Sequence, residues 1–177
     1  MKRSACLLLI LACNVWAGRA QMSARQTQRV KSAMVRAIES SQVTDSLYKA
    51  LAAGSNKDPL TRGYLASLEA LKAKHAWNPY NKVKFANRSA KTMAEAIRSD
   101  PGNLELRFMR FSIQHYMPAF LGLSKDLDTD RREILKHYRE RSFSKVDKEL
   151  VRNIARFMIE SGRCTGAEEE IFRKYTA

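Results

Sequence analysis

The sequence of 177 residues has few of the residues that interrupt or cross-link a chain. It contains seven glycines, four prolines and three cysteines. This scarcity excludes a fold with many tight turns, such as a β-sandwich, and favours long helices. Acidic residues are also in the minority, since 18 Asp and Glu stand against 32 Lys and Arg and leave a formal net charge of +14. Such an excess of positive charge predicts attraction to polyanionic surfaces.

Long apolar runs are absent except at the beginning of the chain. Residues 5–16 form a short apolar run, ACLLLILACNVW, which follows two basic residues and precedes small residues at Gly18 and Ala20. The run is too short to span a bilayer as a helix, and it fits the pattern of a cleaved export signal. We therefore expect residues 1–20 to be a signal peptide and residues 21–177 to form one domain, periplasmic or secreted.

The cysteines allow a second form of export. Residues 10–13, ILAC, resemble a lipobox, which would place a diacylglycerol on Cys13 and make the chain an anchored lipoprotein. Cleavage after Ala20 would instead leave Cys164 as the last cysteine, and one cysteine cannot form an intramolecular disulfide. In either form we expect a domain that disulfides do not stabilise.

Apolar residues recur at helical spacing along the rest of the chain, and no convincing alternation of the β-strand type is present. The expected helices cover residues 24–41, 44–53, 59–75, 79–98, 103–117 and 129–141, and two more follow Ser144 and Thr165. The pattern predicts an all-α fold, a compact bundle of antiparallel helical hairpins.

Capping residues mark where several of these helices begin. The dipeptides at 58–59 and 78–79 each place Asp or Asn before a proline, which combines a side-chain acceptor with a favourable first helical residue. Residues 144–147, Ser-x-x-Asp, and 165–168, Thr-x-x-Glu, resemble capping boxes. The local signals therefore agree with the periodicity.

The helix expected at residues 103–117 has apolar residues on two sides and a narrow polar strip between them. Such a helix is normally packed between neighbours, and a buried charge without a partner is costly. Two interpretations follow: the arginines of the strip pair with acidic side chains inside the protein, or they face a groove that binds an anion or a peptide. The strip consists of Asn103, Arg107, Arg110 and Gln114.

The groove interpretation is the main functional hypothesis. Arg107, Arg110 and Gln114 would bind a protein or peptide of the bacterial envelope, and Tyr80 and Tyr116 would supply aromatic contacts. The protein would then be a binding or scaffolding module without catalytic activity.

Two helices each carry a cationic face, which gives the alternative hypothesis. Such faces attach a protein to anionic lipid headgroups or to envelope polysaccharide, although they are also common as solvated helix surfaces. We do not expect nucleic acid as a partner, because an exported chain does not meet it and no basic motif with interleaved aromatics is present. The faces comprise Lys84, Arg88 and Lys91 on one helix, and Arg131, Arg132 and Lys136 on the other.

Signals for catalysis or metal binding are weak. The motif Asp126-x-Asp128-x-Asp130 begins like an EF-hand loop, but Arg131 and His137 stand where that loop needs Gly and Glu. We expect these aspartates to cap the following helix and to complement its dipole. No phosphate-binding glycine loop, nucleophile elbow or paired metal-ligand spacing is present. We therefore expect no enzyme activity, no cofactor and no metal.

One segment resembles a tetratricopeptide repeat (TPR). Residues 94–103, AEAIRSDPGN, are similar to the end of such a repeat, and the similarity extends back over about one repeat. The matching positions are Tyr80 as the aromatic of the first helix, Ser89 as the small residue at the helix crossing, Ala96 as the second small residue and Pro101 as the terminal proline. Trp77 stands where the repeat has glycine, and no second copy is evident. The resemblance implies a TPR-like helical fold, in which grooves between helices hold peptides.

The wider segment, residues 78–122, resembles an uncharacterised family of small exported bacterial proteins, a similarity that covers most of the mature chain. The resemblance implies a location in the bacterial envelope and a compact helical domain, and it transfers no activity.

Overall fold

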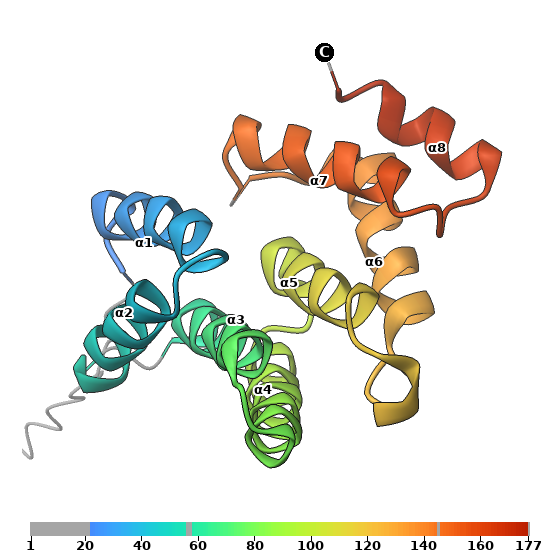
Figure 1. The fold of residues 1–177 in the computed structure, drawn as a ribbon. Helices are drawn as coiled ribbons and strands as arrows, with labels where there is room; N and C mark the ends of the chain where they lie inside the picture. Colours follow the sequence, from blue (N-terminus) through green and yellow to red (C-terminus); the bar gives the residue numbers. More distant parts are fainter. Residues whose placement is uncertain (1–21, 56–57, 145, 177) are drawn as a thin grey trace, which may run out of the picture.

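The computed structural model describes residues 22–55, 58–144 and 146–176. The expected signal peptide, the lipobox and Cys13 lie outside these residues. The described part of the chain is all-helical, with eight α-helices and no strand, as predicted (Figure 1). The helices are α1 (Ala24–Ala37), α2 (Ser41–Ala53), α3 (Pro59–His75), α4 (Pro79–Ser99), α5 (Leu104–His115), α6 (Leu127–Glu140), α7 (Lys148–Glu160) and α8 (Gly166–Arg173), with a short 3-10 helix at Ala119–Leu121.

Most of the predicted helix starts are confirmed. Asp58 caps α3 by accepting a hydrogen bond from the Thr61 N–H, and Asn78 caps α4 in the same manner through the Tyr80 N–H. Thr165 opens α8 with a complete capping box. The side-chain acceptors satisfy backbone donors that have no partner inside the helix, and this fixes where each helix begins.

The predicted start of α7 is wrong. The sequence pattern placed a capping box at residues 144–147, with Ser144 as the cap. In the structure Asp147 is the cap, and its carboxylate accepts a hydrogen bond from the Leu150 N–H at 2.8 Å. The preceding residues form a turn instead, because the Val146 N–H is bonded to the Phe143 carbonyl.

The predicted break between the first two helices is misplaced, because the sequence pattern extends the first helix to residue 41 and begins the second at residue 44. Helix α1 ends at Ala37, and Ser40 caps α2 through the Val43 N–H. The Thr44 hydroxyl is completely buried and donates to the Ala37 carbonyl at 2.8 Å. This bond satisfies a carbonyl at the end of α1 and holds the corner between the two helices.

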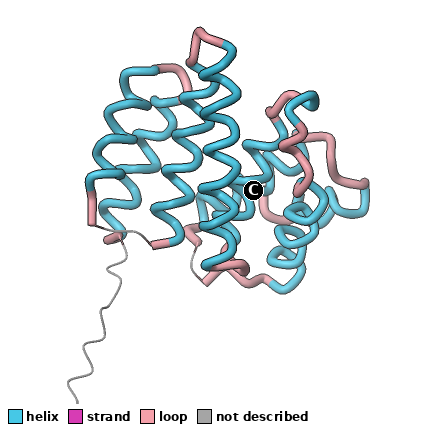
Figure 2. Tube along the Cα trace, turned by 90° about the horizontal axis from the view of Figure 1, so that it is seen from below, coloured by secondary structure: helices cyan, strands magenta, loops and turns pink. Residues whose placement is uncertain are grey.

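The helices pair in chain order. Helices α1 and α2, α3 and α4, α5 and α6, and α7 and α8 are direct neighbours, and α3 also contacts α1, α2 and α5. Figures 1 and 2 show α1 to α4 as a row on one side of α5, with α6 to α8 on the other side. Helix α5 therefore lies between the two halves, as its two apolar sides predict.

The core has two clusters that meet at α5. One joins α3, α4 and α5 through Ala66, Met93 and Leu106. The other joins the four helices α5, α6, α7 and α8 around Phe111. Gly63 of α3 lies against Leu106, so that a Cβ at this position would overlap the leucine side chain. The missing side chain is what allows α3 and α5 to approach so closely.

None of the described helices combines the length and the apolar character that crossing a bilayer requires.

Candidate functional site

A hollow of about 290 Å³ lies where α4 and α5 diverge, beside the segment that leads into α6. We call it the α4–α5 hollow. Helix α4 contributes small and flexible side chains to it, and α5 contributes larger ones. Its apolar lining consists of Ala90, Met93, Ala94, Ile113, Met117 and Leu123.

The rim of the hollow is polar and mostly cationic. Lys91 and Lys125 are exposed at the rim, and the described residues include no ion-pair partner for either. Ser89 also borders the hollow, and its buried hydroxyl has no hydrogen-bond partner in the described part of the chain. Two residues of the predicted binding site, Arg110 and Gln114, complete the wall together with Asp126.

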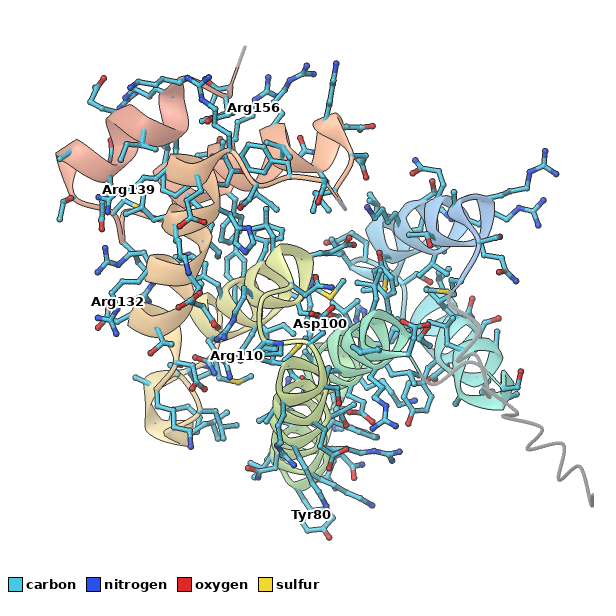
Figure 3. The ribbon with its side chains drawn as sticks, turned by 180° about the vertical axis from the view of Figure 1, so that it is seen from behind. Tyr80, Asp100, Arg110, Arg132, Arg139 and Arg156 are labelled. Carbon is cyan, nitrogen blue, oxygen red and sulfur yellow. The ribbon has the colours of Figure 1, made fainter. Side chains whose placement is uncertain are left out.

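The arginines of the polar strip are paired inside the protein. Asp130 of α6 is completely buried, and its carboxylate accepts hydrogen bonds from Arg110 Nε at 2.6 Å, Arg110 Nη2 at 2.8 Å and Arg107 Nη1 at 3.0 Å. Burial lowers the pKa of Arg110, but the hydrogen bonds and the charge of Asp130 outweigh it and raise the pKa overall. Figure 3 shows Arg110 directed from α5 toward α6.

Gln114 is bonded to the chain in a similar way. Its amide nitrogen donates to Asp126 Oδ2 at 3.0 Å, and its amide oxygen accepts from the Asp126 N–H at 3.0 Å. The Ser124 hydroxyl donates to the Gln114 carbonyl at 3.1 Å. Gln114 thus fixes the segment between α5 and α6 against α5.

The structure therefore confirms internal pairing for the two arginines. The hydrogen bonds seen for Arg107, Arg110 and Gln114 all go to groups of the chain itself. Arg110 and Gln114 form part of the wall of the hollow, whereas Arg107 does not line it. The expectation that the aspartates of the Asp126-x-Asp128-x-Asp130 motif cap α6 with their side chains is wrong. Asp130 mainly neutralises arginines, and Asp126 makes no side-chain capping bond. The sequence gives no signal for this pairing, since the partners are 20 and 23 residues apart.

The two predicted aromatic residues do not line the hollow. Tyr80 is 71% exposed at the start of α4, and in Figure 3 it projects from the end of that helix, away from Arg110. Tyr116 is 76% exposed and packs edge-on against His115 and Phe157. The structure thus brings together Arg110 and Gln114 and leaves both tyrosines outside.

Each predicted cationic face contains one residue that is already paired. Arg88 Nε lies 2.7 Å from the buried carboxylate of Glu69, and its Nη2 donates to the Tyr48 hydroxyl. Arg131 pairs with Glu168 and lies near Asp128. The remaining four residues of the faces are exposed and make no ion pair with the described residues: Lys84, Lys91, Arg132 and Lys136.

The sequence pattern does not predict the burial of two carboxylates, Glu69 and Glu105. Glu69 of α3 accepts hydrogen bonds from Tyr48 and from Thr92 in addition to its contact with Arg88. Helical periodicity treats a glutamate as a surface residue, so it gives no warning of a buried one. Glu69 is 2% exposed in the structure, and no local feature of the sequence indicates this burial.

The second buried carboxylate connects distant helices. Glu105 accepts a hydrogen bond from the Tyr64 hydroxyl at 2.5 Å, and Lys31 of α1 lies 3.4 Å from Glu105 and 2.8 Å from Asp147. Burial raises the pKa of Tyr64, and the charge of Glu105 raises it further. Burial raises the pKa of Asp147, but the bonds from Lys31 and Leu150 lower it below its usual value.

The reactive side chains lie apart from these networks. His115 accepts a hydrogen bond from Arg163 Nε at 3.0 Å, and burial and the Arg163 charge lower its pKa. Burial raises the pKa of the half-buried Cys164 to about 11, so its thiol is protonated at neutral pH. Across residues 22–55, 58–144 and 146–176, no group of three or more His, Cys, Asp or Glu side chains is placed to hold a metal ion.

Comparisons of the chain with models of protein families, with curated proteins and with solved structures find no match in any of the three. The two resemblances described for the sequence therefore stay predictions.

Proposed function

We propose that the protein is a non-enzymatic binding module of the bacterial envelope, in which the α4–α5 hollow receives part of a partner protein. The observation that carries this proposal is an apolar hollow with unpaired lysines at its rim. An apolar lining with a few polar groups at the edge is the usual composition of a binding pocket.

The dimensions and charges of the hollow indicate the kind of partner. A volume of about 290 Å³ is at the lower limit for a ligand pocket and suits one or two side chains of a peptide. Lys91 and Lys125 favour carboxylates beside that anchor. We infer that the partner presents an acidic segment, and that an apolar residue of this segment enters the hollow between Met93 and Ile113.

The wall of the hollow is preorganised. Arg110 is fixed by Asp130, and Gln114 is fixed by Asp126, so neither side chain has to be ordered when a partner binds. A binding site that is already ordered loses less conformational entropy on association.

The location and architecture belong to the same proposal. The N-terminal signal at residues 1–20 would export the chain, which is then soluble in the periplasm or secreted, or anchored through a lipid on Cys13. The order of helical hairpins supports a TPR-like arrangement, and the resemblance at residues 94–103 agrees with it.

The test is selection of peptides from a random display library, followed by binding measurements with variants. Ala94→Trp fills the hollow from the exposed side of α4, and we expect it to abolish binding of the selected peptides. Lys91→Gln with Lys125→Gln should weaken binding of acidic peptides, whereas the distant Lys136→Gln should leave it unchanged. The proposal would be contradicted if the selected peptides bound the Ala94→Trp variant and the Lys91/Lys125 variant as tightly as the original chain.

A second candidate function is electrostatic attachment to anionic lipid or polysaccharide. The observation that favours it is the burial of Glu69, Glu105 and Asp130, because three acidic groups are thereby removed from the surface, where exposed Lys and Arg side chains remain. The attaching residues would be Lys84, Lys91, Arg132 and Lys136. Binding of this kind weakens steeply as salt rises, which distinguishes it from the anchored peptide.

A further inference from the structure

Exposed apolar side chains gather at one end of the protein. Seven large hydrophobic residues are exposed among the described residues, and five of them lie in or beside the α1–α2 and α3–α4 turns. Trp77, in the second turn, is 96% exposed. We call the five residues the turn edge: Val35, Ile38, Trp77, Tyr80 and Val83.

The two turns are held side by side. Lys74 Nζ donates to the Ile38 carbonyl at 2.7 Å and forms an ion pair with Glu39 at 3.2 Å. His75 Nε2 lies 2.9 Å from the Ala37 carbonyl. Figures 1 and 2 show both turns at the same end of the helical row, and in Figure 3 Tyr80 projects outward from that end. The turn edge is therefore one surface.

The fold itself does not require these side chains. Asn78 and Pro79 are sufficient to start α4, and among the described residues Trp77 belongs to neither core cluster. Isolated exposed apolar residues are common, but a group that shares one end of a molecule indicates an interaction surface.

The charges around the turn edge are mostly positive. Lys82 and Lys84 are exposed on the first turns of α4, and Arg36 is exposed near the end of α1. The acidic groups nearby are already paired, since Glu39 contacts Lys74 and Asp45 contacts Lys72. An aromatic and aliphatic surface with lysines around it has the composition of a region that enters the headgroup layer of an anionic bilayer.

The shape also favours a bilayer over a folded partner. The side chains project from two turns and do not line a hollow, so a deformable surface can take them up without a matching cavity. Trp and Tyr are the residues that prefer the boundary between lipid and water.

We propose that the turn edge docks on an anionic lipid surface, with Trp77 and Tyr80 in the headgroup layer and Lys82 and Lys84 on lipid phosphates. The proposal is independent of the α4–α5 hollow. It differs from attachment through the two cationic faces, because it assigns one surface and one orientation, with the start of α4 toward the lipid and without a role for Arg132 and Lys136.

The experiment uses Trp77 as a local probe in the full chain. The sequence has two tryptophans, so Trp16→Phe leaves Trp77 as the reporter. The probes are vesicles of phosphatidylcholine, with or without phosphatidylglycerol, and brominated lipids as quenchers. We expect the Trp77 emission to move to shorter wavelength and to be quenched with the anionic vesicles alone. This readout is local, so attachment through the apolar run at residues 5–16 cannot imitate it.

Matched variants test the residues named. Lys82→Gln with Lys84→Gln should weaken the Trp77 response by roughly 30-fold in lipid concentration, whereas Arg132→Gln with Lys136→Gln should change it little. Tyr80→Ser should also reduce the response, and Phe120→Ser, which alters an aromatic that is 85% exposed elsewhere, should not. Circular dichroism verifies that each variant keeps its helices.

Two outcomes would overturn the proposal. One is a chain that binds anionic vesicles while Trp77 emission stays unchanged, which would assign attachment to the cationic faces or to the N-terminal run. The other is an equal loss in the Lys82/Lys84 variant and in the Arg132/Lys136 variant, which would mean general attraction without a docking surface. Neither outcome bears on the hollow, whose test uses peptides and Ala94→Trp.

Discussion

Asp130 is the residue on which the polar interior between α5 and α6 depends. Its carboxylate has no exposure to solvent and accepts hydrogen bonds from two arginines of the neighbouring helix. Removing one partner of such a group leaves the other charges buried without compensation.

We predict that Asp130→Ala lowers the free energy of unfolding by about 3 to 5 kcal/mol, because Arg107 and Arg110 lose their shared acceptor. Urea denaturation followed by circular dichroism measures the loss. Asp128→Ala is the control on the same helix, since that side chain is 82% exposed, and it should change stability by less than about 0.5 kcal/mol. Equal stabilities for both variants would refute a structural role for the Asp130 network.

At the scale of helices, the contact between α3 and α5 depends on a missing side chain. Gly63→Ala should destabilise the protein by about 1 kcal/mol or more despite the better helix propensity of alanine, because Leu106 is fully buried and cannot move into open space. Thermal unfolding of this variant should be compared with Gly102→Ala, where an added Cβ meets no atom within 4 Å. A gain in stability at position 63 would show that the helices can separate without cost.

The start of α7 gives a second prediction about an element. Asp147→Asn should lower stability by about 0.5 kcal/mol at neutral pH, because asparagine keeps the cap but loses the charge that contacts Lys31, whereas Ser144→Ala should be neutral. The pKa of Asp147 is lower in the folded protein than in the unfolded chain. Its contribution is therefore complete above about pH 4 and disappears as the pH falls through the lower folded pKa.

Denaturation of the Asp147 variant over a range of pH checks the sign. The difference from the original chain should shrink below about pH 4 and stay constant above it. A difference that grows on acidification would contradict the assignment of the cap to Asp147.

For the molecule as a whole, Lys31 connects the first helix to the middle and to the C-terminal half. Lys31→Ala should remove the ion pairs that connect α1 to Glu105 and Asp147. Glu105 would keep its hydrogen bond from the Tyr64 hydroxyl. We expect faster hydrogen exchange of the α1 amides and little change in α6 and α8. Arg29→Ala, at an exposed position of the same helix, should leave exchange as it is.

The sequence predicts the all-α fold and most of its helix starts because capping and periodicity are local. It places the break between the first two helices a few residues too late, because the corner after Ala37 depends on a hydrogen bond from Thr44. It also leaves open whether Arg107 and Arg110 are free or paired, because their acceptor comes from another helix. The hollow has no sequence signature, since three separate segments form it.

The length of α4 has a consequence for the two proposed surfaces. Lys84, which the proposal places on lipid phosphates, lies seven residues before Lys91 at the rim of the hollow, which corresponds to about 10 Å along the helix. That separation exceeds one Debye length at physiological ionic strength. Lipid charge at the turn edge would thus be partly screened at Lys91, so that a tethered molecule keeps part of its attraction for acidic partners from solution. Helix α4 would act as an electrostatic spacer, and occupancy of one surface would not compete with occupancy of the other.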